Sequence, residues 1–147
     1  MLRLFRLLLP GMVWLGLAGC AAPDRPPLPG PWTLVFENAE IRIALDTSRV
    51  LREPGQEWAW LRMEYGSPEP IPGAAGTFDV SESLVGLRCE RREMQINRML
   101  LFDGSGSLIE ESQTGGAWRD PSELRFDEVF DRTCSALAER RRTGGAG

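Results

Sequence analysis

The sequence predicts an α+β domain in which a single antiparallel sheet of about six strands carries a C-terminal α-helix packed on it. Two observations predict this class. Between residues 32 and 110, short runs alternate apolar with polar side chains, and turn residues separate the runs. From residue 126 the apolar residues instead recur every three or four positions, which is the spacing of one helix face. A chain of 147 residues with 42% hydrophobic residues supports one such domain and a leader.

Residues 1–19 are predicted to be a bacterial lipoprotein signal peptide. Arg3 and Arg6 precede an apolar run over 7–17, which is too short to remain as a membrane span. The following Leu17-Ala18-Gly19-Cys20 resembles a lipobox, in which small residues before the cysteine admit the signal peptidase and the Cys20 thiol receives the lipid. The alternative is an ordinary secretory signal with a chance cysteine near the cleavage site.

Residues 20–31 are predicted to be the lipidated cysteine and a tether. Five of the eleven residues from 21 to 31 are Pro, a composition that favours extended polyproline II. The alternative is a ligand for a Pro-binding module. Ala21 is not the Asp that commonly signals retention in the inner membrane, so we expect an outer-membrane lipoprotein. Removal of the leader with Arg3 and Arg6 takes the formal charge from −4 to 15 − 21 = −6, so lipid rather than a basic patch must hold the chain to the bilayer.

Two further cysteines, Cys89 and Cys134, are predicted to form a disulfide, because an exported chain meets an oxidising compartment. The bridge closes a loop of about 46 residues, for which the chain-entropy model gives roughly 4 kcal/mol. The alternatives are two buried free thiols or a two-cysteine metal site, and the latter lacks both His partners and a C-x-x-C spacing.

The domain is expected to span residues 32–142. Its strand-like runs are Trp32–Phe36, Ile41–Leu45, Arg49–Arg52, Trp58–Tyr65, Leu84–Arg92, Met94–Phe102 and Ser107–Glu110. The Pro- and Gly-rich segment 66–76 is expected to be a long loop, either a recognition loop or an indifferent surface insertion. Asp103-Gly104-Ser105-Gly106 predicts the turn of a hairpin.

The C-terminal helix is expected to begin with Asp120 as N-cap, Pro121 in the first helical position and Glu123 completing a capping box. Its apolar face comprises Phe126, Val129, Phe130, Thr133, Cys134 and Leu137. The last helical residues are Arg140–Arg142, which suit the negative end of the helix dipole. We expect 143–147 to be a disordered tail.

The composition removes most kinds of chemistry, and we expect no enzyme activity, cofactor or metal. Without His there is no Ser-His-Asp or Cys-His mechanism, and the serines after Gly104 do not fit G-x-S-x-G. A calcium loop starting at Asp103 fails because its twelfth position is Thr114 rather than Glu. No Gly-rich nucleotide-binding motif occurs, and an acidic chain without a basic stripe is not expected to bind nucleic acid.

One strand raises a question of orientation. Trp58, Trp60 and Arg62 share one face of the run 58–65, and Ala59, Leu61, Met63 and Tyr65 share the other. We expect the tryptophan face to point into the core. If it is exposed instead, Trp58, Trp60 and Arg62 would make an aromatic–arginine binding surface.

Several motifs together carry a family resemblance. They are the lipobox, the strand starting at Trp32, Leu45-Asp46-Thr47-Ser48, Trp58-Ala59-Trp60, Leu87-Arg88-Cys89-Glu90-Arg91-Arg92, Asp103-Gly104-Ser105-Gly106, Trp118 with Pro121 and Ser122, and Cys134. The chain resembles the surface-adhesin protein E family of bacterial lipoproteins. The resemblance implies an antiparallel sheet tied to a C-terminal helix by a disulfide. It also implies binding of host matrix proteins and plasminogen, and a tendency to form homodimers. The family's adhesive segments contain Lys; this chain has none, so no binding residue is carried over.

The expected function is therefore that of a lipid-anchored cell-envelope protein with a non-catalytic, adhesin-like binding domain. Its partners would be the membrane, through the lipid, and host or envelope proteins. The alternative is a structural or assembly lipoprotein that faces the periplasm. The sequence leaves open which side of the outer membrane the domain faces.

Overall fold

The computed structural model describes residue 28 and residues 30–144. The predicted signal peptide, Cys20 and most of the predicted tether lie outside these residues, as does the end of the predicted tail. No helix within the described part of the chain is both long enough and apolar enough to cross a membrane.

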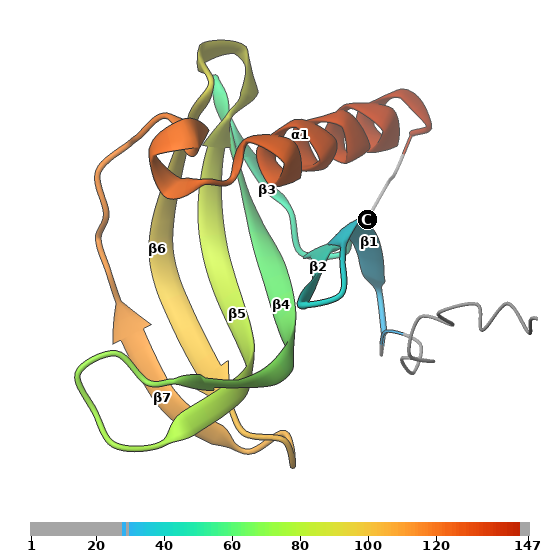
Figure 1. Cartoon of the computed structure of the whole chain (residues 1–147). Helices are drawn as coiled ribbons and strands as arrows, with labels where there is room; N and C mark the ends of the chain where they lie inside the picture. The colour runs from blue at the N-terminus through green and yellow to red at the C-terminus, as the bar shows by residue number, and fades with distance from the viewer. Residues whose placement is uncertain (1–27, 29, 145–147) are drawn as a thin grey trace, which may run out of the picture.

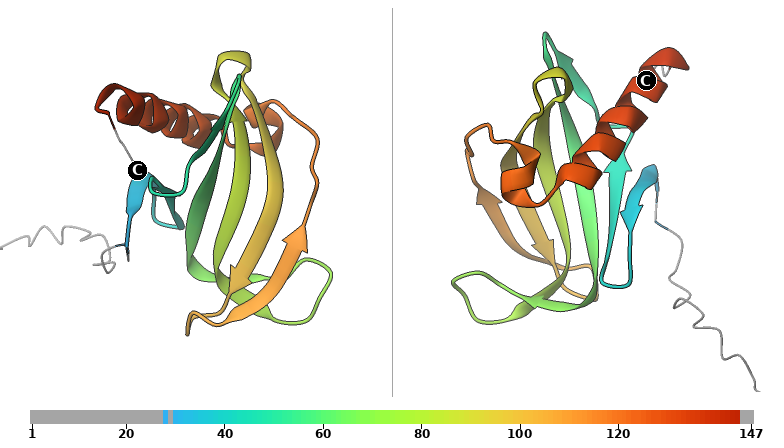
Figure 2. Two further views of the ribbon diagram at one scale, coloured as in Figure 1. Left: turned by 180° about the vertical axis from the view of Figure 1, so that it is seen from behind. Right: turned by 45° about the horizontal axis from the view of Figure 1, so that its top comes forward.

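The described residues form one antiparallel sheet and one long helix, which confirms the predicted α+β class. The strands are β1 (Trp32–Glu37), β2 (Ile41–Asp46), β3 (Leu51–Glu53), β4 (Gln56–Pro70), β5 (Thr77–Arg88), β6 (Glu93–Phe102) and β7 (Leu108–Gln113). They lie in the order β1-β2-β4-β5-β6-β7, and β3 pairs with β4 beyond the end of β2. The sheet curves strongly, and helix α1 (Asp127–Arg142) crosses one face of it (Figures 1 and 2).

The main core lies between α1 and the inner face of the sheet, which is the face that α1 covers. On β4, Ala59, Leu61 and Met63 alternate with larger neighbours and are 0%, 2% and 8% exposed. The helix presents Val129, Phe130, Thr133 and Leu137, all buried. These side chains form the apolar stripe through which the helix packs on the sheet, so the predicted face of the helix is confirmed.

The predicted loop over 66–76 is wrong in its first half. Strand β4 continues to Pro70, which pairs with Thr77 at the start of β5, so the loop is limited to residues 71–76. A register shift between Glu64 and Glu69 bends β4 there. Prolines are tolerated in this stretch because β2 pairs with β4 only as far as Tyr65, which leaves β4 with a free edge. A second small core of Ile71, Phe78 and Leu101 fixes this end.

Two other boundaries differ from prediction. The expected strand 84–92 begins earlier, at Thr77, and ends at Arg88, where Cys89–Arg91 form a 3₁₀ turn with Arg92 at φ +51°. The expected helix start at Pro121 is instead a separate 3₁₀ turn over Pro121–Leu124, capped by Asp120, whose carboxylate accepts a hydrogen bond from the Ser122 backbone at 2.9 Å. Arg125 at φ +57° breaks the helix there, and α1 begins two residues later.

Candidate binding groove

The tryptophans of β4 lie on the outer face of the sheet, opposite α1, so the expectation that they point into the core is wrong. The small and medium side chains Ala59, Leu61 and Met63 occupy the space beneath the helix. An indole also carries an N–H that needs a partner, and Trp58 finds one outside the core: its Nε1 donates to Glu53 Oε2 at 3.2 Å. Both Trp58 and Trp60 are half-buried.

A groove of about 530 Å³ opens on this outer face. Its lining residues, which we call the tryptophan groove, are Ser48, Arg49, Val50, Leu51, Glu53, Trp58, Trp60, Leu84 and Asn97. Leu84 lies on β5, the neighbour of β4, and Asn97 lies on β6, one strand further along the sheet. The loop after β2 together with β3 forms the other wall. Leu51 is 60% exposed, the most exposed large apolar side chain among the described residues. An open, aromatic-lined hollow with a few polar groups is the usual form of a binding site.

Arg49 contacts both the aromatic rings and a buried acid at one end of the tryptophan groove. Its guanidinium lies 5.3 Å from the centre of the Trp60 ring and 5.9 Å from that of Trp32, within cation–π range of both. Its Nε also contacts Asp46 Oδ2 at 2.5 Å, and the Asp46 side chain is only 2% exposed. Burial alone would raise the pKa of Asp46, but hydrogen bonds from Ser48 and Arg49 outweigh it and leave the pKa below its ordinary value. The ion pair therefore fixes Arg49 over the two indoles at neutral pH.

At the other end of the tryptophan groove, the aromatic rings lie over Gly86 of β5. The rings of Trp58 and Trp118 lie 6.0 Å apart at an angle of 55°, and both indoles pass over this glycine. Arg88 stacks on Trp118, with its guanidinium 3.8 Å from the ring centre, and it also pairs with Glu93 at 3.1 Å. The walls of the groove are thus supported by residues that do not line it.

Arg62, predicted as part of the same surface, does not line the tryptophan groove. Its Nε lies 2.9 Å from Glu64 Oε1, and its Nη1 lies 2.8 Å from Glu82 Oε1. Arg42 contacts the second oxygen of Glu64. Burial alone would raise the pKa of Glu64, but hydrogen bonds from Arg42 and Arg62 outweigh it and lower the pKa. Arg62 therefore belongs to a neutralised charge network across β2, β4 and β5.

Glu53 gives the groove a negative charge at its β3 end. Its carboxylate is exposed and accepts hydrogen bonds from the side chains of Gln56 and Trp58. These bonds, the one from Gln56 first, lower the pKa of Glu53. Glu53 forms no ion pair with any described residue, whereas the charge of Arg49 is balanced by Asp46. A ligand in the groove would therefore meet one unbalanced carboxylate beside an indole.

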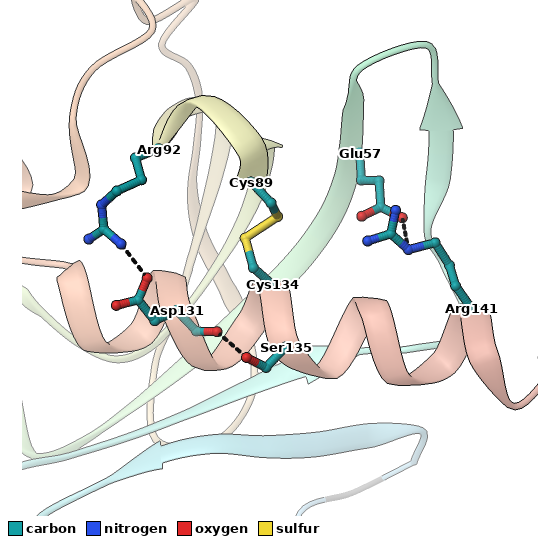
Figure 3. Close-up of a disulfide and its surroundings, with 7 residues drawn as sticks. All are labelled: Glu57, Cys89, Arg92, Asp131, Cys134, Ser135 and Arg141. Carbon is teal, nitrogen blue, oxygen red and sulfur yellow. Dashed lines mark hydrogen bonds and ion pairs between the residues drawn. A yellow bond between two sulfur atoms is a disulfide. The ribbon is translucent and has the colours of Figure 1, made fainter.

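The structure confirms the disulfide between Cys89 and Cys134, whose Cα atoms are 5.8 Å apart. It ties the 3₁₀ turn after β5 to the middle of α1 (Figure 3). On one side of the bridge, Arg92 Nη1 contacts Asp131 Oδ1 at 2.6 Å. On the other, Arg141 Nε lies 4.0 Å from Glu57 Oε1. These contacts place the helix on the inner face and leave the outer face free of α1.

Among residues 28 and 30–144, no group of three or more His, Cys, Asp or Glu side chains is arranged to hold a metal ion. The groove itself offers aromatic rings, an amide, hydroxyl and carboxylate groups and one arginine, but no paired acid and base. Sequence reasoning found Trp58 and Trp60 and missed Leu51, Leu84, Asn97 and the support from Trp118. These residues come from different strands, so only the strand register brings them together.

Comparison of the chain with protein-family models, with curated proteins and with solved structures finds no match. The resemblance to the surface-adhesin protein E family therefore stays a prediction.

Proposed function

We propose that this chain is a lipid-anchored protein of the bacterial cell envelope, whose domain binds a protein partner non-catalytically through the tryptophan groove. The groove is the observation that carries the proposal. It places Trp58, Trp60 and the 60%-exposed Leu51 on a face that α1 leaves open. Tryptophan and arginine are the residues that most often dominate binding energy at protein interfaces.

The rigidity of the groove supports the same proposal. Arg49 is held by Asp46 over Trp60, and Trp58 is held between Glu53 and Trp118. Side chains that are already ordered lose little conformational entropy when a partner binds, so more of the contact energy appears as affinity. Surface tryptophans without such support would lose part of that energy on becoming ordered.

The anchoring part of the proposal is supported by the lipobox and the Pro-rich segment that precedes Trp32. Cell fractionation tests it, comparing the wild type with a Cys20→Ser chain whose residues 1–19 are replaced by a secretory leader that is cleaved without a lipid-modified cysteine. We expect the wild type in the membrane fraction and Cys20→Ser in the soluble one. Equal membrane association of both would contradict lipid anchoring.

The side of the membrane decides between an adhesin-like binder and the second candidate, a periplasm-facing structural or assembly lipoprotein. Proteinase K added to intact cells tests this, with lysed cells as the control. Cleavage in intact cells supports the adhesin-like reading, and protection until lysis supports the periplasmic one. The exposed residues 72–76 of the loop after β4 are the expected cleavage site.

Photo-crosslinking in cells tests the binding part. A benzophenone amino acid replaces Leu51 in the groove, and a matched chain carries it at Leu108, which is 53% exposed on β7 at the opposite sheet edge. We expect a protein adduct from position 51 that is absent from position 108. Adducts of equal yield from both positions, or none from position 51, would overturn the groove as the binding surface.

A further inference from the structure

We propose that the protein partner places a basic side chain, Lys or Arg, in the tryptophan groove, where its cation binds Glu53 while an apolar neighbour packs on Leu51. This inference rests on the proposed function, because it names the chemistry of the partner at the same groove. Three features support it: a free oxygen on Glu53, the balance of the surrounding charges and the order of the side chains along β3.

The carboxylate of Glu53 keeps one oxygen free for a ligand. Its Oε2 accepts hydrogen bonds from the side chains of Gln56 and Trp58, whereas its Oε1 accepts none from any described residue. Glu53 is exposed, and these two bonds, the one from Gln56 first, hold its pKa below the ordinary value. The indole N–H of Trp58 therefore fixes an ionised acceptor at the edge of the aromatic lining.

The arginines around the tryptophan groove already have acidic partners. The ion pairs, each at 3.1 Å or less, are Arg49 with Asp46, Arg52 with Glu57, Arg88 with Glu93 and Arg98 with Glu111. Gln56 separates Glu53 from Arg88, since its amide nitrogen donates to Glu53 and its amide oxygen accepts from Arg88 Nε at 3.3 Å. Within the described part of the chain no cation pairs with Glu53, so the groove offers its negative charge to a partner.

Strand β3 presents an apolar and an acidic side chain in sequence. Leu51 and Glu53 are two residues apart, so they point to the same face of the sheet and lie about 7 Å apart along the strand. In the register Leu51 lies opposite Trp58, and Glu53 lies opposite Gln56. A partner segment in extended conformation, with an apolar and a basic residue two positions apart, matches this spacing because its side chains alternate with the same period.

The indole of Trp58 suits the stem and the charge of a basic side chain. Lys and Arg pack their alkyl stems on apolar surfaces while the charged head stays at a polar rim. On Trp58 such a head reaches Glu53, whose carboxylate lies 3.2 Å from the indole nitrogen. The face of an indole also attracts a cation directly. Arg49 already occupies Trp60 in this way, with its guanidinium 5.3 Å from the ring centre, which leaves Trp58 for the partner.

The experiment uses the full chain in cells, with a benzophenone amino acid at Asn97 on the side of the groove away from β3. Glu53→Gln removes the charge and keeps the shape, because its amide oxygen can accept both hydrogen bonds that Oε2 accepts. We expect Glu53→Gln to lower the yield of the protein adduct about fivefold and Glu53→Lys to lower it to background. Glu123→Lys is the matched control and should leave the yield unchanged, because Glu123 is exposed outside the groove.

Charge reversal on the partner supplies a second readout that misfolding cannot imitate. Digestion with chymotrypsin, which leaves Lys and Arg within the peptides, and mass spectrometry locate the adduct on the partner. Each Lys or Arg of that segment is then replaced by Glu in turn. We expect one of these replacements to abolish the adduct with the parent chain, and Glu53→Lys to restore it. Glu123→Lys should not restore it.

Four results would overturn the inference. They are an adduct with lipid in place of protein, a yield that Glu53→Gln leaves unchanged, equal losses from Glu53→Lys and Glu123→Lys, and a partner segment in which Glu53→Lys restores no reversed charge.

The two proposals fail separately. If the benzophenone captures a protein and neither variant of Glu53 changes the yield, the proposed function stands and the inference on the basic side chain falls. If the parent chain gives no protein adduct from position 51 or from position 97, both fall.

Discussion

The indole rings of Trp58 and Trp118 meet above Gly86, with their centres 6.0 Å apart. A Cβ atom at residue 86 would lie 2.8 Å from Trp118 and 2.9 Å from Trp58. The glycine is required by this close approach, since its φ is not positive. The position of Trp58 in the tryptophan groove thus depends on residue 86 of β5 having no side chain.

Gly86→Ala should therefore destabilise the domain by about 1–3 kcal/mol, because the two indoles must move apart in a packed layer. Guanidinium unfolding measures the change, and tryptophan fluorescence should shift with it. Gly104→Ala is the control, since a Cβ there meets Asp79 at an ordinary 3.4 Å. Equal stability of Gly86→Ala and the wild type would contradict the packing described.

Removal of the disulfide should lower the free energy of unfolding by about 2–4 kcal/mol, because the reduced chain gains freedom over the loop between Cys89 and Cys134. The double variant Cys89→Ser/Cys134→Ser tests this in denaturant unfolding. Dithiothreitol should lower the stability of the wild type and leave that of the double variant unchanged. If dithiothreitol left the free energy of unfolding of the wild type unchanged, the bridge would not stabilise the fold.

Stability should be nearly constant between about pH 6 and 8, since the chain contains no His. The pKa values of Asp46 and Glu64 are lowered in the folded state. Such groups contribute stability above their unfolded values of about 3.8 and 4.5, and the contribution is lost as the pH falls below them. Urea unfolding between about pH 6 and pH 3 should show the loss, and Glu64→Gln should reduce it. A free energy of unfolding that rises from pH 6 to 4 would contradict the stabilising role of the ion pairs of Asp46 and Glu64.

Thr133 is fully buried in α1, and its hydroxyl has no hydrogen-bond partner among the described residues. Thr133→Val keeps the shape and removes the unsatisfied polar group, so we expect a gain of up to about 1 kcal/mol. Thr133→Ala, which leaves a cavity instead, should lose stability. Thermal unfolding ranks the three chains. A valine variant less stable than the alanine variant would show that the hydroxyl is needed.

The sequence predicted those features that depend on local periodicity. Alternation located β2 and residues 58–65 of β4, β-prone runs located β1 and β6, and the spacing from Val129 to Leu137 located the buried face of α1. The disulfide followed from pairing the two remaining cysteines of a chain that is predicted to be exported. These signals do not require knowledge of which segments meet in space.

The features that sequence reasoning missed depend on tertiary context. Both faces of the run 58–65 carry large or apolar side chains at its start, Trp58 and Trp60 on one and Ala59 and Leu61 on the other, so alternation alone did not tell which face α1 covers. Pro68 and Pro70 read as loop residues, yet they fit a strand because β4 has a free edge there. Asp120 and Pro121 start a 3₁₀ turn as readily as an α-helix, and the positive φ of Arg125 decides between them.

The most direct test of the tryptophan groove as the binding surface measures the yield of the partner adduct and the free energy of unfolding in the same chains. A benzophenone amino acid replaces Asn97, on the β6 side of the tryptophan groove, and Leu51→Ser or Leu108→Ser is added as a second change. Both leucines are exposed, so the free energy of unfolding of each serine variant should lie within about 0.5 kcal/mol of that of its parent. We predict that Leu51→Ser abolishes the partner adduct in cells and that Leu108→Ser preserves it. An adduct that survives Leu51→Ser, or that is lost equally with Leu108→Ser, would contradict the claim that the tryptophan groove is the binding surface.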